Sequence, residues 1–256
     1  MDPVGTARPQ PAMPVVAAIA RAATSTGERF DFLLANARLE SGLDPSARAR
    51  TSSAAGLFQF VERTWLDMVR RHGAKHGLGW AAAAIEGTGR ALRVADPALR
   101  TAILKLREDA AAAAAMAAEL TAENREHLAR RLGRPARDAE LYLAHVLGVG
   151  GATRFLKALQ TGPDAAAAHV TPRAARTNPG LFFDRSGRVR SLADVFATLA
   201  ARLARAGADG PHPAAPAAPA PARQAPIHRP LPVAAGPSIA PQAAHAAYLL
   251  LARLGA

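Results

Sequence analysis

Apolar residues recur every three to four positions along most of this chain, and few stretches alternate with a period of two. A repeat near 3.6 residues indicates an amphipathic helix, whereas a period of two would indicate a half-buried strand. Half of the 256 residues are hydrophobic, and alanine, the best helix former, dominates among them. The sequence therefore predicts an all-α fold, and its length suffices for one sizeable domain with extensions.

Changes in composition divide the chain into four parts. Residues 1–13 contain several prolines and are expected to form a disordered tail, and residues 14–206 carry the helical pattern of the domain. Residues 207–242 are rich in Pro and Ala, which predicts a flexible, largely extended linker. Residues 243–256 contain a short apolar helix candidate, which either docks on the domain or contacts a partner or a membrane surface.

Periodicity and capping residues predict the individual helices. They are expected near residues 14–24, 28–41, 60–72, 97–120, 121–132 and 136–147, around 155–159, and from Ser191 onwards. Ser25 followed by Glu28 is read as a capping box, and Asp96-Pro97 as an N-cap with proline in the first turn. Residues 73–95, rich in Gly and Ala, give no clear pattern.

Glu40 stands at the end of the second predicted helix, before the expected stop at Gly42 and Pro45. It continues the apolar face formed by Phe30, Leu33, Leu34 and Ala37. We therefore expect a buried carboxyl, and burial disfavours the charged form. The negative end of the helix dipole adds about 0.3–1 kcal/mol in the same direction. A carboxyl that stays protonated suits a general acid, whereas the alternative is an ordinary exposed or ion-paired glutamate.

Glu40 belongs to the first of two short motifs that follow each other along the chain. The chain reads Glu40-Ser41, then a polar loop, then Gly56-Leu57-Phe58-Gln59. This resembles the first two motifs of the soluble lytic transglycosylase family, which are Glu-Ser and Gly-Leu-Met-Gln. The resemblance covers roughly residues 14–206 and implies a lysozyme-like helical domain with a glycan groove, in which Glu40 is the single catalytic acid.

The same resemblance assigns the neighbouring residues to substrate binding. It implies that Ser41 hydrogen-bonds near the reacting centre and that Gly56 lets the backbone approach the sugar. It also implies that Gln59 binds acyl groups of the substrate, with Leu57 and Phe58 beside it; Phe58 stands where methionine is usual. The alternative interpretation of the motif is a glycine turn that enters a helix, with Leu57 and Phe58 in the core.

The third family motif, usually Ala-Tyr-Asn-Ala-Gly, is altered here, which suggests a divergent branch. If Gly148 matches the motif glycine, His145 replaces the tyrosine and Val146 the asparagine. Tyr142 and His145 are three residues apart on one helix face, so either is placed to contact Glu40. The alternative for His145 is a core histidine with satisfied hydrogen bonds.

The resemblance implies cleavage of the MurNAc–GlcNAc β-1,4 bond of peptidoglycan with formation of 1,6-anhydroMurNAc. Glu40 would act first as acid and then as base, and neither metal nor cofactor is required. Most glycoside hydrolases instead use two carboxylates, so a hydrolytic muramidase with Asp44 as base is one alternative. The other alternative is a peptidoglycan-binding or secretion-apparatus scaffold with impaired catalysis.

Charge and targeting signals constrain partners and location. The formal net charge of +12 either attracts a polyanion or reflects arginines spread over helix surfaces, and no nucleic-acid-binding motif is present. There is no cysteine, which excludes disulfides and thiolate metal sites, and no run is long enough to span a membrane. The resemblance implies the periplasm or cell wall and a flagellar, secretion or phage apparatus as partner. No clear signal peptide is evident, so the sequence leaves the export route open.

Overall fold

The computed structural model describes residues 12–50 and 52–208. The expected tail at the N-terminus, the Pro/Ala-rich linker and the helix expected at 243–256 lie almost wholly outside these described residues. The first helix begins at Ala12 and the last ends at Ala208, so the helical part extends two residues past each expected domain boundary.

The described residues form helices and isolated β-bridges without any strand, which confirms the all-α prediction. The α-helices are α1 (Ala12–Thr26), α2 (Phe30–Ser41), α3 (Glu62–His72), α4 (Gly79–Ala84), α5 (Pro97–Lys105), α6 (Ala110–Leu132), α7 (Asp138–Thr161), α8 (Ala167–Val170), α9 (Pro172–Thr177), α10 (Pro179–Phe182) and α11 (Leu192–Ala208). Short 3-10 helices span Gly73–His76, Gly89–Ala91 and Leu106–Glu108. None of the described helices combines the length and apolar character needed to cross a bilayer.

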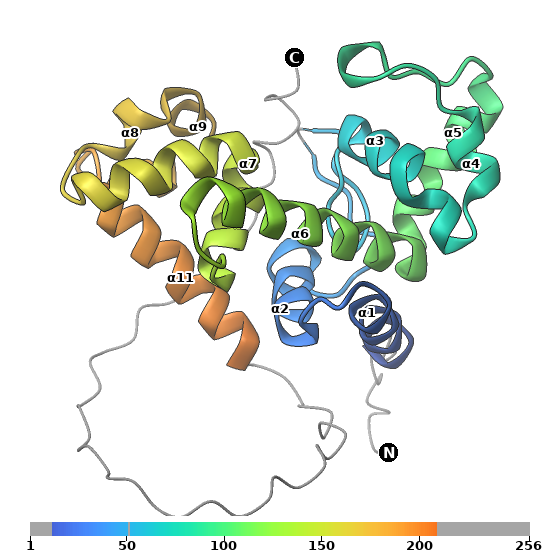
Figure 1. Ribbon diagram of the computed structural model, residues 1–256, viewed down its shortest axis with the longest axis horizontal. Coiled ribbons are helices and arrows are strands. Elements are labelled where there is room, and N and C mark those ends of the chain that lie inside the picture. The colour runs from blue at the N-terminus through green and yellow to red at the C-terminus, as the bar shows by residue number, and fades with distance from the viewer. Residues whose placement is uncertain (1–11, 51, 209–256) are drawn as a thin grey trace, which may run out of the picture.

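Helix α6 forms the centre of the molecule and packs against α1, α2, α3 and α7 (Figure 1). Helix α11 packs against α2 and α7, while α3, α4 and α5 lie together at the other end of α6. The alanine tract of α6 is buried, and α1 presents Ala18 and Ala22 to the same core. Small side chains let helix axes approach closely, because the interaxial distance depends on the side chains at the contact.

Two helix boundaries differ from the sequence prediction, and one predicted cap is confirmed. Helix α6 is separated from α5 because Asp109 caps a new helix, its carboxylate accepting from the Ala112 N–H. The expected break near Thr121 is absent, since this residue lies inside α6 and its hydroxyl donates to the Ala117 carbonyl. The Asp96 cap is confirmed, because its carboxylate accepts from Ala98 N–H and Leu99 N–H.

The Ser25–Glu28 capping box is wrong. Helix α1 continues to Thr26, and the Ser25 hydroxyl donates back to the Ala22 carbonyl inside that helix. The buried Glu28 carboxylate instead accepts hydrogen bonds from the Nε and Nη2 atoms of Arg125 of α6, which ties the α1–α2 connection to the central helix.

Helix α7 bends at Gly148, where the expected helix ended. Gly148 adopts a positive φ of 67°, a region that favours glycine, and the helix resumes after it and runs to Thr161. The short helix expected around Phe155 is therefore the second half of α7. The bend separates the segment that carries Tyr142 and His145 from the half that packs toward α8.

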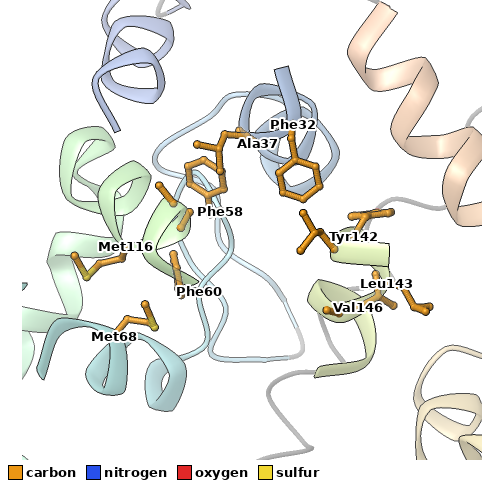
Figure 2. Packing of buried hydrophobic residues seen from close by; sticks show 14 of the residues in the cluster. Phe32, Ala37, Phe58, Phe60, Met68, Met116, Tyr142, Leu143 and Val146 are labelled. Atoms are coloured by element: carbon orange, nitrogen blue, oxygen red, sulfur yellow. The ribbon is translucent and has the colours of Figure 1, made fainter. Parts of the chain in front are cut away.

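Large apolar side chains pack between α2, α6, α7 and the loop that joins α2 to α3. Figure 2 shows Phe32 of α2, Phe58 and Phe60 of the loop, Met116 of α6 and Tyr142 of α7 in this cluster, and all five are at most 3% exposed. Burying a large side chain of this kind contributes about 1.5–3 kcal/mol. The cluster fixes the loop against the end of α2, where Glu40 lies.

Candidate active site

Glu40 lies in the last turn of α2 and is buried, with 1% of its side chain exposed. The helix ends because Gly42 adopts a left-handed conformation with φ 64°, and its N–H donates to the Ala37 and Arg38 carbonyls. The prediction that Glu40 continues the apolar face into the core is therefore confirmed.

His145 of α7 contacts the acid directly. Its Nε2 atom and the Glu40 Oε1 atom lie 3.0 Å apart and share a hydrogen bond, although the two residues are 105 positions apart in the chain. The His145 side chain is 9% exposed. The sequence prediction that His145 or Tyr142 contacts Glu40 is confirmed for His145.

Tyr142 lies one turn before His145 and supports its ring. The two rings are stacked with centroids 6.2 Å apart and an interplanar angle of 14°. Burial raises the pKa of Tyr142, and the charge of Glu40 raises it further, so the phenol stays protonated in the physiological range. The Tyr142 hydroxyl is buried and has no hydrogen-bond partner among the described residues.

Ser41 connects the end of α2 to the second predicted motif. Its hydroxyl lies 2.8 Å from the Leu57 carbonyl and 3.2 Å from the Ala37 carbonyl, so the shorter contact reaches across to the loop. The structure thus brings together Glu40, Ser41 and Leu57, as the motif predicts. Ser41 acts on the loop backbone here, since its hydroxyl donates to carbonyl oxygens.

Gly56 begins a tight turn that requires glycine. Its φ is 80°, and a Cβ at this position would lie 1.7 Å from the Arg107 carbonyl oxygen. Its own N–H donates to the Ala47 carbonyl over 2.8 Å. The close backbone approach predicted for Gly56 is thus an approach to the Leu106–Glu108 turn of the protein itself.

The remaining residues of the Gly-Leu-x-Gln motif are buried. Leu57 is fully buried and Phe58 is 1% exposed, as the core interpretation of the motif predicts. The Gln59 Nε2 atom donates to the Ala47 carbonyl at 3.0 Å and to the Gly56 carbonyl at 2.9 Å. Gln59 has a positive φ of 48°, and its amide donors hold the loop closed. The Gln59 side chain thus stabilises the loop through hydrogen bonds to its backbone, a role that the resemblance does not imply.

Arg107, in the 3-10 helix Leu106–Glu108, binds backbone carbonyls of the same loop, and the sequence did not predict this role. Its Nη1 atom donates to the Ser53 carbonyl at 2.5 Å and to the Phe60 carbonyl at 3.1 Å. The side chain is buried and its Nε atom also donates to the Leu104 carbonyl. No local signal points to this role, because the loop carbonyls that it binds lie 47 and 54 positions away in the chain.

A pocket opens beside this constellation, between α2, the loop, α6 and α7. It is lined by Phe32, Asn36, Phe58, Phe60, Ala117, Leu120, Thr121, Asn124, Leu141 and His145. Phe58 and His145 were predicted as site residues, whereas Asn36, Thr121 and Asn124 were missed. The pocket therefore reaches the ring that contacts Glu40, and Glu40 itself lies behind that ring.

Asp44, the second carboxylate considered from the sequence, is exposed and belongs to a local turn. Its Oδ1 atom accepts hydrogen bonds from the Ser46 N–H at 2.8 Å and the Ser46 hydroxyl at 2.7 Å. Across the part of the chain that the structure describes, no group of three or more His, Asp or Glu side chains is arranged to hold a metal ion. A search of protein-family models found no match to this chain.

Proposed function

We propose that this protein is a peptidoglycan lytic transglycosylase with a lysozyme-like helical domain, and that Glu40 is its single acid and base. The observation that carries the proposal is the surroundings of Glu40. A buried carboxyl at the C-terminal end of a helix contacts His145, and Ser41 joins that helix end to the Gly56–Gln59 turn. This agrees with the order of motifs in the sequence and with an all-α fold.

The chemistry follows from one carboxyl. The protonated Glu40 donates its proton to the glycosidic oxygen while the bond from that oxygen to C1 of MurNAc breaks. The 6-hydroxyl of the same sugar then attacks C1, and its proton passes to the Glu40 carboxylate. The products are 1,6-anhydroMurNAc and a free 4-hydroxyl on GlcNAc, and the enzyme returns to its starting protonation state.

His145 orients the acid in this proposal. Its Nε2 atom lies 3.0 Å from Glu40 Oε1, and this hydrogen bond holds the buried carboxyl in one orientation. His145 is therefore a positioning residue that acts through Glu40.

The structure of the loop favours this non-hydrolytic reaction over a muramidase. A hydrolase would need a second carboxylate to activate water. Asp44 is exposed and its Oδ1 atom is engaged by Ser46, so it is poorly suited to that role. In the proposed setting the protein acts on glycan strands in the periplasm or cell wall, in service of a flagellar, secretion or phage apparatus. The net charge of +12 favours binding to the acidic peptides of the wall.

Digestion of purified sacculi with mass spectrometry of the released muropeptides tests this function. The wild-type protein should release anhydro products, and Glu40→Gln should release none, while Glu119→Gln serves as a matched control at a glutamate that does not line the pocket. Products with free reducing ends would assign hydrolysis instead. Binding to sacculi without release by any of the three proteins would indicate a glycan-binding scaffold.

A further inference from the structure

Positive charge is concentrated in the last third of the described chain. Residues 150–208, which form the second half of α7 and helices α8 to α11, contain nine Lys and Arg residues and three acidic residues, all Asp. Residues 12–149 contain nineteen basic and fifteen acidic residues, so charge is nearly balanced there. Helices α8 and α9 lie on the side of the molecule opposite to α4 and α5 (Figure 1). The basic excess therefore belongs to one side of the structure.

A hairpin between α10 and α11 carries part of this charge to the surface. Phe183 and Val189 form an isolated β-bridge, and the turn between them contains Arg185 and Arg188. Both arginines are exposed, Arg188 over 85% of its side chain, and the aliphatic Val189 is 40% exposed beside them. We refer to residues 183–190 as the basic hairpin.

Asp184 holds the tip of the basic hairpin in one conformation. Its Oδ1 atom accepts from the Ser186 hydroxyl at 2.6 Å, the Ser186 N–H at 2.8 Å and the Arg188 N–H at 3.0 Å. Its Oδ2 atom accepts from Arg188 Nε at 3.0 Å, and Gly187 supplies the φ of 82° that the turn needs. The hydrogen bond from the Ser186 hydroxyl, with those from Arg188, holds the pKa of Asp184 well below its ordinary value, so the carboxylate stays charged. A turn that is organised in advance loses little conformational entropy when it binds a partner.

Like charges also gather between the basic hairpin and α11. Arg202 of α11 is half-buried, and burial lowers its pKa against the opposing effect of Tyr142. The positive charges of Arg190, the last residue of the hairpin, and of Arg205 lower that pKa further. None of the described groups that shift the pKa of Arg202 is a carboxylate. An anionic partner would relieve this repulsion.

The side chains of this surface favour a lipid bilayer over a nucleic acid. Guanidinium groups bind phosphate oxygens, and an apolar side chain between them can enter the headgroup region of a bilayer. Proteins that bind single-stranded nucleic acids instead stack bases on exposed aromatic rings. In residues 150–208 the exposed large apolar side chain is Val189, and no aromatic side chain of this range is exposed. A bilayer with anionic headgroups therefore matches both the charge and the apolar contact.

We propose that the basic hairpin docks on an anionic phospholipid bilayer, with Arg185 and Arg188 on lipid phosphates and Val189 between the headgroups. The other basic residues of 150–208 add attraction over a longer range. The inference uses neither Glu40 nor the pocket beside it, so it stands or fails independently of the proposed function.

Binding of the full-length chain to vesicles tests the proposal. Co-sedimentation compares vesicles of phosphatidylglycerol and phosphatidylcholine with vesicles of phosphatidylcholine alone. The wild type should bind the anionic vesicles and lose this binding as the salt concentration rises, because salt screens exposed charges. Each basic residue at an anionic surface contributes about fivefold in affinity, so Arg185→Gln combined with Arg188→Gln should weaken binding about 30-fold. Replacing both arginines with lysine keeps the charge and should retain most of the binding.

The hairpin between α4 and α5 offers a matched control. Glu86 and Arg93 form an isolated β-bridge there, Arg90 is exposed, and Arg93 pairs with Glu86 as Arg188 pairs with Asp184. Arg90→Gln combined with Arg93→Gln removes the same charge from the opposite side of the molecule (Figure 1). This variant should bind the anionic vesicles nearly as well as the wild type.

Equal losses in the two double variants would reduce the effect to net charge and overturn the proposal. Equal binding to both kinds of vesicle, or binding to neither, would also overturn it. Tighter binding to duplex DNA than to the anionic vesicles, lost in the Arg185 and Arg188 variant, would assign the surface to nucleic acid instead. Should that variant not fold, Arg185→Glu decides, because it leaves the hydrogen bonds of Asp184 in place. Unchanged vesicle binding by Arg185→Glu would overturn the proposal.

Discussion

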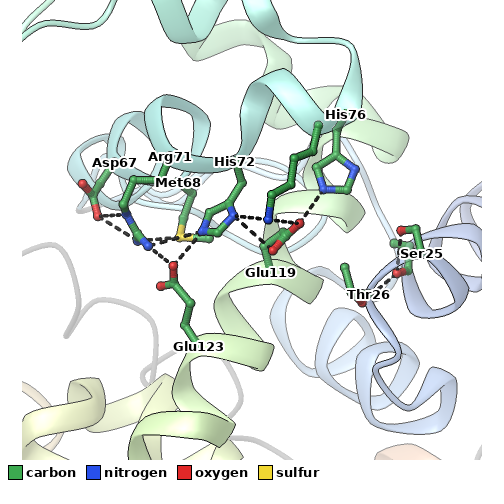
Figure 3. Close-up of polar contacts among 11 residues, drawn as sticks. Ser25, Thr26, Asp67, Met68, Arg71, His72, His76, Glu119 and Glu123 are labelled. Atoms are coloured by element: carbon green, nitrogen blue, oxygen red, sulfur yellow. Dashed lines mark hydrogen bonds and ion pairs between the residues drawn. The ribbon is translucent and has the colours of Figure 1, made fainter.

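Among the residues that the structure describes, histidine contacts glutamate at two places, and the surroundings of the two contacts differ. At the first, Glu40 and His145 form a buried pair between α2 and α7. At the second, His72 and His76 contact Glu119 and Glu123 between α3, the following 3-10 turn and α6 (Figure 3). We refer to these four residues with Arg71 and Lys75 as the α3–α6 network.

Each carboxylate of the network contacts more than one basic side chain. Glu119 contacts His76 at 2.8 Å, His72 at 3.1 Å and Lys75 at 3.7 Å, and Glu123 contacts both His72 and Arg71. Burial of Glu119 raises its pKa, but the hydrogen bond from His76 and the nearby positive charges outweigh it, so the pKa lies below the ordinary value. A carboxylate held in its charged form in this way is suited to joining helices and unsuited to giving up a proton.

The Glu40–His145 pair is more deeply buried and borders a pocket. The Glu40 carboxyl is less exposed than that of Glu119, 1% against 12%, and the ring of His145 lines a pocket whose wall includes the unpaired Asn36 Oδ1. The two contacts between the same residue types therefore differ in burial and in access to a pocket.

The largest expected effect separates the two glutamates by activity. Glu40→Gln should lower the release of anhydro-muropeptides by a factor of about 10²–10⁴, the usual contribution of a general acid. Glu119→Gln should retain the wild-type rate, because its carboxyl lies in the network. The rates of muropeptide release, corrected for folded protein, measure both. Equal losses in the two variants would contradict the assignment of the acid.

The next effect separates the two histidines. His145→Ala should lower the rate about 10–100-fold, because the Glu40 carboxyl loses the contact that orients it. His145→Gln should recover part of the rate, since its amide N–H can reach the same carboxyl. His72→Ala should leave the rate unchanged.

A pH–rate profile distinguishes positioning from general structural damage at His145. The alanine variant should change the shape of the profile, and a purely structural role would lower the whole curve without changing its shape. A profile that keeps its shape in His145→Ala would contradict the role assigned to the ring.

The third effect concerns stability, for which Glu119 should matter more than Glu40. Glu119→Gln should lower the free energy of unfolding by about 1–3 kcal/mol, because several charge-assisted hydrogen bonds of the network lose their acceptor. Glu40→Gln should change it by less than about 0.5 kcal/mol, since glutamine has the same shape and still bonds His145. Urea unfolding at neutral pH measures both values. A larger loss in Glu40→Gln would make the Glu40–His145 pair a structural contact.

The sequence predicted the local elements of the site better than the contacts that assemble it. The end of α2 was predictable because a left-handed glycine follows an amphipathic pattern, and the burial of Glu40 followed from the same pattern. The proximity of His145 followed from a one-turn spacing together with the motif order. These features depend on residues close in sequence or on a motif, where simple rules apply.

The parts that were missed depend on tertiary structure. Arg107 binds loop carbonyls, which every residue possesses, so no residue type marks its partners. Asn36 is an unremarkable helix residue until α6 and α7 close a pocket over it. The Ser25–Glu28 capping box failed for a similar reason, since Arg125 of α6 competes for the glutamate.

The smallest expected effect is the pH dependence of the network. Burial lowers the pKa of His72 below its ordinary value of 6.5, despite the opposing charge of Glu119, and the positive charges of Arg71 and Lys75 add to the lowering. The unfolded chain therefore takes up the proton first as the pH falls, and the free energy of unfolding decreases from about pH 6.5 downwards. Glu119, whose pKa is also lowered, extends the decrease below its ordinary value of 4.5.

Urea midpoints at about pH 7, about pH 6 and about pH 5 measure this dependence, and His72→Gln should flatten the upper part of the curve because the group that takes up the proton is gone. Glu40→Gln leaves the network intact and should keep the wild-type slope over the same interval. A slope that persists in His72→Gln would assign the pH dependence to another group. Because none of the network residues lines the pocket, protonation of the network should change stability, whereas the cleavage rate per folded molecule should follow Glu40. That is the separation that the two His–Glu contacts predict.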